Sequence, residues 1–225
     1  MSAQRRSRRM SRLLLGYFML FTLPKAVAGP MGFQGSWMTM GDIGPNWREV
    51  FINYAITPRD AVGLSQTYMR ADDDSRSRDL TELTYTRLLH RWNQPESQAN
   101  LWFVGGIGEL WRRDRVTDQR SRQAAISPSV QADYETTRIY LSAMHRLYRA
   151  SDLNHDYTAI RAGFSFFEPH YDQTQPWLIV EARTMNDLSD RTEITTMIRL
   201  INRNYFVEVG ANNFGQPRLN FMLIF

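Results

Sequence analysis

The sequence predicts an all-β protein that forms a closed, antiparallel transmembrane β-barrel of about 12 strands. Three observations lead to this prediction. The first 28 residues have the form of an export signal. Almost every later segment alternates between apolar and polar residues with a period of two, which is typical of strands with two different faces. The final segment alternates in the same way and ends on the aromatic residue Phe225.

Residues 1–28 are predicted to be a cleaved secretory signal peptide. A start containing five arginines is followed by the apolar run 13–23, by Pro24, and by the small-residue site Ala26-Val27-Ala28. A helix of this apolar run would be only about 16 Å long, too short to cross a hydrocarbon core of about 30 Å. We therefore expect cleavage near residue 28, with residues 29–225 forming the barrel domain.

Removing the signal reverses the net charge of the chain. The whole sequence carries +4, but six of its 27 basic residues and none of its 23 acidic residues precede residue 29. Subtracting those six leaves 21 basic residues against 23 acidic ones, a net charge of −2. The excess of basic residues thus lies in the export signal and does not indicate nucleic-acid binding. The lack of cysteine excludes disulfides and cysteine-ligated metals.

The remainder divides into segments rich in Thr, Val, Ile, Tyr and Phe, bounded by turn residues. The predicted strands are 33–41, 46–57, 60–71, 79–92, 98–111, 121–133, 136–148, 155–167, 176–187, 191–202, 204–213 and 217–225. Ten strands would result if the first and sixth of these were loops.

The positions of the turns favour twelve strands. Both termini of such barrels normally lie in the periplasm, where the turns are short, and longer loops lie outside. Twelve strands place the short turns 57–60 and 202–204 on the side of the termini and the loops 72–78, 112–121 and 149–154 on the other side. Eleven strands would separate the termini, and ten would place the longest loop on the wrong side.

The alternation separates an apolar face, expected to contact lipid, from a polar face, expected to line the lumen. On the last strand, Arg218 and Asn220 share one face while the residues Leu219, Phe221, Leu223 and Phe225 share the other. The charged residues assigned to the lumen are Glu49, Glu82, Glu109, Arg138, Arg161, Glu181, Arg183, Glu193, Arg199, Glu208 and Arg218.

The end of the chain resembles the C-terminal assembly signal of bacterial outer-membrane β-barrel proteins, which the insertion machinery recognises on the last strand. The resemblance covers the final eight residues and the general strand pattern, with Asn220 where the commonest form has glycine. It implies a location in the outer membrane, with outer-membrane lipid, lipopolysaccharide and the assembly machinery as partners. It identifies a class and no narrower family.

The nearly balanced charges of the lumen face predict a narrow or plugged lumen. Arginines and glutamates on neighbouring strands are expected to pair, because an unpaired buried charge costs several kcal/mol. A wide, selective pore more often carries an excess of one sign. We therefore predict a small channel, a transport accessory or an envelope component. Purely structural pairing and an ion pathway both stay open as roles for these charges.

Two other functions are considered. The first is copper handling, because Met31, Met38 and Met40 supply three thioethers, which suit Cu(I), although methionine is also an ordinary filler of cores. This arrangement is loosely similar to the Met-rich N-terminal regions of outer-membrane copper-resistance proteins. No other cofactor is expected.

The second is a barrel-embedded hydrolase of the lipase or protease type. Its nearest candidate is the pair His155-Asp156 beside Asp152. Neighbours of this kind are ordinarily solvated loop residues, so the sequence assigns no catalytic residue. Separately, the basic loop 112–122 offers arginines that suit the phosphates of lipopolysaccharide, although a solvated run of charge is the more ordinary explanation.

Overall fold

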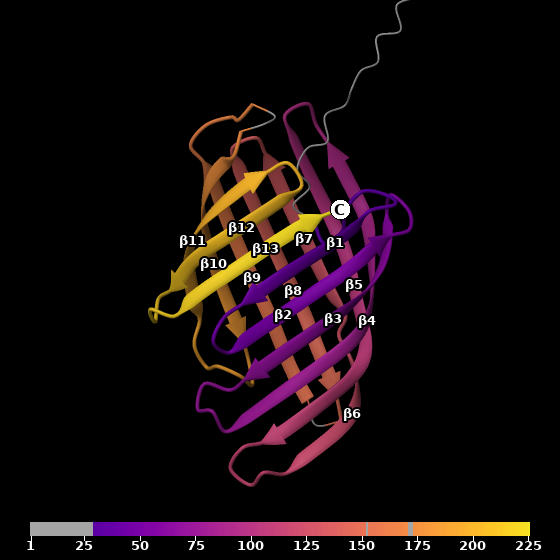
Figure 1. Cartoon of the computed structure of the whole chain (residues 1–225), viewed down its shortest axis with the longest axis vertical. Helices are drawn as coiled ribbons and strands as arrows, with labels where there is room; N and C mark the ends of the chain where they lie inside the picture. Colours follow the sequence, from indigo (N-terminus) through magenta and orange to yellow (C-terminus); the bar gives the residue numbers. More distant parts are fainter. Residues whose placement is uncertain (1–28, 152, 171–172) are drawn as a thin grey trace, which may run out of the picture.

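The computed structural model describes residues 29–151, 153–170 and 173–225, which form one antiparallel sheet closed on itself (Figure 1). The predicted signal peptide, residues 1–28, lies outside the described residues. The strands are β1 (Trp37–Ile43), β2 (Trp47–Ala55), β3 (Asp60–Arg70), β4 (Arg76–Asn93), β5 (Ser97–Asp114), β6 (Arg120–Ile126), β7 (Ser129–Thr136), β8 (Ile139–Ala150), β9 (Leu153–Ser165), β10 (Gln175–Met185), β11 (Glu193–Asn202), β12 (Tyr205–Asn212) and β13 (Pro217–Ile224).

The prediction of a closed barrel of twelve strands is confirmed, because β6 and β7 are two parts of one strand. Both parts pair with β5 in one continuous register, from Ile107 opposite Ile126 to Val104 opposite Ser129. Both also pair with β8. Pro128 lies at the interruption, and proline has no N–H to donate to the ladder. Pairing of β1 with β13 closes the barrel, and the ten-strand alternative is wrong.

The two ends of the barrel differ. The C-terminus lies at the upper end in Figure 1, which we call the terminus end. At the opposite loop end, β4 and β5, each of 18 residues, project with β6 well beyond the other strands. Since termini of such barrels normally lie in the periplasm, the loop end is expected to face outside.

An apolar surface covers the outside of the wall. On β11, Ile194, Ile198 and Leu200 are 48%, 46% and 44% exposed, while the intervening Thr195, Met197 and Arg199 are buried inside. Most of the other strands repeat this alternation. A closed sheet with apolar side chains outside and charged ones inside is the structure that a lipid bilayer requires. The described residues therefore form a β-barrel of the membrane-spanning type.

No helix within the described ranges is long and apolar enough to span a bilayer.

The last strand has the two faces that the sequence predicted. Its buried residues are Arg218, Asn220, Met222 and Ile224, and Phe225 is 60% exposed on the other face. Phe225 exchanges backbone hydrogen bonds of 2.7 and 2.9 Å with Trp37, which extends the closing seam to the end of the chain. At this seam the ring of Phe221 covers Gly41, where an added Cβ would lie 2.2 Å from the ring. The recognition of this strand by assembly machinery stays a prediction.

Candidate functional site

The interior of the barrel is the candidate functional site, and its largest group of charges lies on one wall. Side chains of β1 and β9–β13 form a balanced set of four arginines and four carboxylates, which we call the wall cluster. Its members are Asp42, Arg161, Glu181, Arg183, Glu193, Arg199, Glu208 and Arg218. Inward-facing positions at alternate residues of adjacent strands bring them together.

Pairs within the wall cluster reach beyond neighbouring strands. Arg218 contacts Asp42 at 2.6 Å, Glu181 at 3.3 Å and Glu193 at 3.4 Å. Arg183 pairs with Glu193 on the adjacent strand and contacts Asp42 at 3.4 Å. Each arginine therefore contacts at least one carboxylate, as buried charges require.

Glu208 accepts hydrogen bonds from three different residues. It has no exposed surface and accepts hydrogen bonds from Arg161, Arg199 and the amide of Asn220, the last at 2.7 Å. The guanidinium of Arg199 also lies over the rings of Tyr140 and Phe206, at 4.7 and 4.8 Å from their centroids. These contacts hold Arg199 within the bore between aromatic faces.

A second set of charges crosses the bore, and we call it the cross-bore triad: Arg146, Glu49 and Glu82. Arg146 on β8 donates hydrogen bonds of 2.7 Å to Glu49 on β2 and of 2.7 Å to Glu82 on β4. Neither β2 nor β4 is a sheet neighbour of β8. The contacts must therefore pass through the interior, and they obstruct it where they meet.

An aromatic layer lies directly on the loop side of the triad. Trp47, two residues before Glu49 on the same face of β2, contacts Tyr148 and Tyr157 with ring centroids 5.7 and 5.0 Å apart. Apolar side chains surround these rings: Met69, Leu80, Leu110, Ala125, Leu153, Ala159, Met185 and Leu188. This part of the interior is packed as an apolar core.

The loop that follows β10 covers the mouth at the loop end. Leu188 in this loop is buried in the aromatic layer, and its carbonyl accepts a hydrogen bond of 2.9 Å from the N–H of Asp72. Asp187 pairs with Arg78 at 2.5 Å and with Arg76 at 2.8 Å, both on β4. The loop is therefore tied to strands on the other side of the mouth.

Gly29, Pro30 and Met31 are the first residues that the structure describes, and they fill the terminus end of the bore; we call them the plug. Met31 packs among Ala55, Ala61, Leu88 and Trp102 and is 1% exposed. The carbonyl of Pro30 accepts a hydrogen bond of 2.7 Å from buried Asn53. A Cβ on Gly29 would lie 2.6 Å from the ring of Trp102, so glycine permits the close approach.

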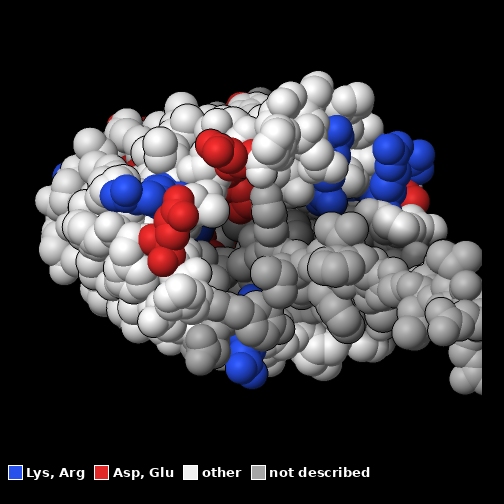
Figure 2. Space-filling model, turned by 90° about the horizontal axis from the view of Figure 1, so that it is seen from above, with Lys and Arg blue, Asp and Glu red and all other residues white. Residues whose placement is uncertain are grey.

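One cavity of about 170 Å³ lies between the plug and the cross-bore triad. Pro30 lines it on the terminus side and Arg146 on the loop side, with Ser142 and Met144 of β8 between them. Figure 2, viewed from the terminus end, shows acidic and basic side chains gathered around the hollow at this end. The cavity is thus bounded on both sides by contacts that close the bore.

Nine of the eleven charged residues assigned to the lumen point into it: Glu49, Glu82, Arg161, Glu181, Arg183, Glu193, Arg199, Glu208 and Arg218. The other two, Glu109 and Arg138, do not, and their assignment is corrected.

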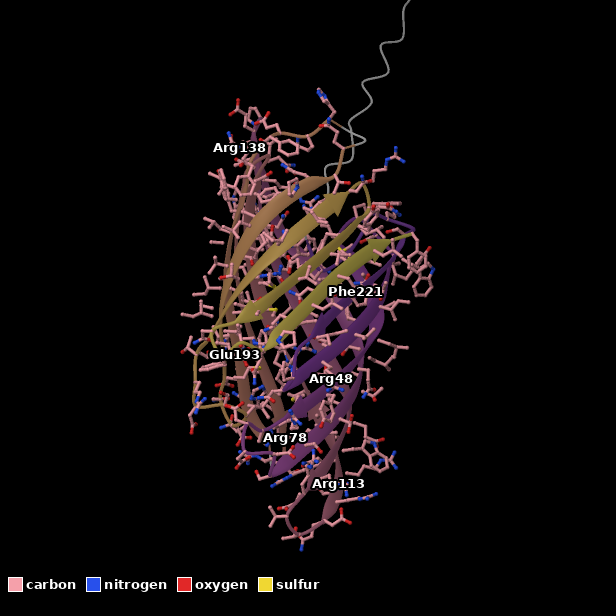
Figure 3. All side chains as sticks on the ribbon, turned by 60° about the vertical axis from the view of Figure 1, so that its left-hand side comes forward. Arg48, Arg78, Arg113, Arg138, Glu193 and Phe221 are labelled. Atoms are coloured by element: carbon pink, nitrogen blue, oxygen red, sulfur yellow. The ribbon has the colours of Figure 1, made fainter. Side chains whose placement is uncertain are left out.

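Glu109 faces outward on the projecting part of β5. Leu110, its neighbour, is buried inside, whereas Glu109 pairs with exposed Arg122 and accepts a hydrogen bond of 3.0 Å from Trp111. Arg138 lies in the turn between β7 and β8 at the terminus end (Figure 3) and donates to the carbonyl of Ser165 at 3.2 Å. Both side chains lie near an end of the barrel, where an outward charge meets solvent.

The sequence reading missed Arg146, Asp42, Arg78 and the plug. Arg146 could have been predicted from the alternation of β8, because it lies two residues from both Met144 and Tyr148 and therefore shares their inward face. Asp42 lies on the inward face of β1 with Met38 and Met40, and the same rule applies. The partners of these residues are distant in the sequence, and no local pattern encodes them.

The three methionines do not come together. Met31 belongs to the plug, whereas Met38 and Met40 pack with Phe206, Met222 and Ile224 beside the closing seam of β1 and β13. The described ranges contain no group of three or more His, Asp or Glu side chains placed to hold a metal ion. All three methionines pack among apolar side chains of the described residues.

His155 and Asp156 lie on opposite faces of β9. His155 is buried inside against Trp47 and Tyr148, while Asp156 faces outward and pairs with Arg149 at 2.6 Å. Asp152, the third member of the proposed hydrolase site, lies outside the described residues. A base and its orienting acid must share a hydrogen bond, so this pair does not form a catalytic dyad.

No protein-family model matches the sequence, and no curated protein matches it. Among solved structures, the fold is similar to the KdgM porin, with 11% identity, a TM-score of 0.46, and coverage of 84% of this chain and 98% of that one. The same porin in complex with disordered oligogalacturonate gives 12% identity, the same TM-score and the same coverage. A loop-deletion mutant of OmpT, an outer membrane protein of Vibrio cholerae, gives 9% identity, a TM-score of 0.33, and coverage of 85% and 97%.

Proposed function

We propose that this protein is a narrow outer-membrane channel whose resting state is closed. The observation that carries the proposal is the cross-bore triad, which joins strands that are not sheet neighbours through the centre of the barrel. The plug lies on one side of the triad and the aromatic layer on the other. Passage of a solute requires all three to move.

The chemistry of the interior supports a channel that can open. A barrel built only for rigidity could fill its bore with apolar side chains, since replacing buried ion pairs by apolar residues is often neutral or stabilising. This bore instead keeps a polar wall of paired charges beside a cavity of about 170 Å³. Balanced signs favour small polar solutes over ions of one sign.

Planar-bilayer conductance tests the proposal. We expect no measurable conductance from the wild-type chain, because three sets of contacts close its bore. The test variant combines Trp47→Ala and Arg146→Ala with deletion of residues 29–33. These changes remove a part of the aromatic layer, of the cross-bore triad and of the plug. It should conduct in small steps and prefer cations, because Glu49 and Glu82 then lack their counter-charge.

Each variant is first checked for folding by its mobility shift between unheated and boiled detergent gels. A folded variant that stays silent would show that the interior is a structural core and not a closed channel. A wild-type protein that opens spontaneously with large conductance would overturn the closed resting state. The single variant Arg87→Ala, in an exposed pair with Asp60 on the outer face, serves as the control and should stay silent.

A further inference from the structure

Arg48 is an outward-facing arginine that contacts no carboxylate among the described residues. It is the second residue of β2 and directly follows the β1–β2 turn at the loop end. Its neighbours Trp47 and Glu49 face the bore, so Arg48 faces the outside, where its side chain is exposed. Val50, the next residue on this outer face, is 47% exposed and belongs to the apolar band.

Arg48 thus stands at the border between the apolar band and the loop end. Tyr68 lies directly opposite it on β3, and the guanidinium is 5.5 Å from the centroid of the tyrosine ring. Aromatic rings at such a border typically lie at the depth of lipid headgroups. A cation at this depth needs a counter-ion, and the described residues supply none within ion-pair distance.

A second arginine–aromatic pair provides a comparison. It lies in the same row of residues that face one another across successive strands. The row runs from Tyr68 to Asp79 on β4, to Trp111 on β5 and to Arg122 on β6. Arg122 lies over the ring of Trp111 at 5.0 Å, as Arg48 lies over Tyr68. Arg122, however, pairs with Glu109. Among the residues that the structure describes, Arg122 therefore has a carboxylate partner and Arg48 has none.

We propose that Arg48 and Tyr68 bind the phosphate of a phosphorylated lipid headgroup in the outer leaflet. The guanidinium presents parallel N–H donors that match two oxygens of a phosphate, and the tyrosine hydroxyl adds a neighbouring donor. The lipid chains lie against the apolar band below, beside Val50. The proposal rests on the placement in the membrane and is independent of whether the bore is closed.

Binding of bis-phosphorylated lipid A to the folded barrel in neutral detergent, measured by native mass spectrometry, tests the proposal. Arg48→Gln should weaken binding about tenfold, the loss expected for one charge-assisted contact. Arg48→Lys should recover only part of the affinity, since lysine keeps the charge but lacks the fork. Asp79→Asn should tighten binding, because it removes an exposed negative charge one strand beyond Tyr68.

Arg122→Gln is the matched control and should leave the affinity unchanged, because Glu109 already pairs with that arginine. Equal losses in Arg48→Gln and Arg122→Gln would show general attraction to a basic surface and overturn the site. Equal affinity for dephosphorylated lipid A would overturn the role of the phosphate. Full displacement of the lipid by inorganic phosphate would overturn the lipid as the source of the anion.

Discussion

Arg146→Ala is expected to lower the free energy of unfolding by about 3–5 kcal/mol, the usual cost of removing one partner from a buried ion pair. Arg146 is 7% exposed and holds two carboxylates, Glu49 and Glu82. Its loss leaves both beside each other without a counter-charge, and Glu82 is 1% exposed. The barrel then contains two uncompensated acids in its bore.

The effect of Arg146→Ala is measured by denaturant titration of the barrel folded into lipid vesicles. Adding Glu49→Gln and Glu82→Gln to Arg146→Ala should recover much of the lost stability, because the uncompensated charges are gone. Arg87→Ala, which removes a pair on the outer surface, should change stability by about 1 kcal/mol or less. Equal effects at Arg146 and Arg87 would show that Arg146 is hydrated.

Glu208→Gln is expected to cost about 3 kcal/mol, because it leaves a buried cation without its only carboxylate partner. Arg199 pairs with Glu208 and with no other carboxylate in the described residues, whereas Arg161 keeps Glu181 at 3.2 Å. Glutamine preserves the shape of the side chain and one acceptor oxygen, so the loss of stability measures the contribution of the negative charge. Arg199→Ala instead leaves Glu208 without one of its two arginine partners and should lower the free energy of unfolding by a similar amount.

The same denaturant titration checks this expectation with a paired variant. Glu208→Gln combined with Arg199→Met removes both charges and keeps the volume, so it should destabilise less than the sum of the single variants. Strictly additive effects near zero would place Glu208 and Arg199 in water. Such a result would reverse the inside and outside faces assigned to β11 and β12.

The sequence predicted the strands well because each barrel strand contacts lipid on one face. This contact requires an apolar residue at every second position of a strand, a pattern that is visible in the sequence. The predicted segment 176–187, for example, corresponds closely to β10 (Gln175–Met185). The first predicted strand, 33–41, begins too early because residues 34 and 35 form a turn, with Gly35 at a positive φ of 82°, and β1 starts only at Trp37. The plug carries no periodic signal, since residues 29–31 are held by the bore and not by a neighbouring strand.

Lumen residues were predictable only where the alternation is clear. Glu193, Arg199 and Glu208 lie on strands with strict alternation, and all three face the bore. Glu109 was misassigned because it lies where the hairpin projects beyond the apolar band and an outward charge is tolerated. The contact between Arg146 and Glu49 joins residues 97 positions apart, and its geometry depends on the closure of the whole barrel.

The coupling energy between Arg146 and Glu82 measures most directly whether charges meet across the bore. These residues lie on β8 and β4, which are not sheet neighbours, so coupling has to come from side-chain contact inside the barrel. A double-mutant cycle of Arg146→Met and Glu82→Gln should give a coupling of about 1.5–3 kcal/mol, as contacting buried residues do. Additive effects, with a coupling near zero, would mean that water separates the two walls and that the bore is open.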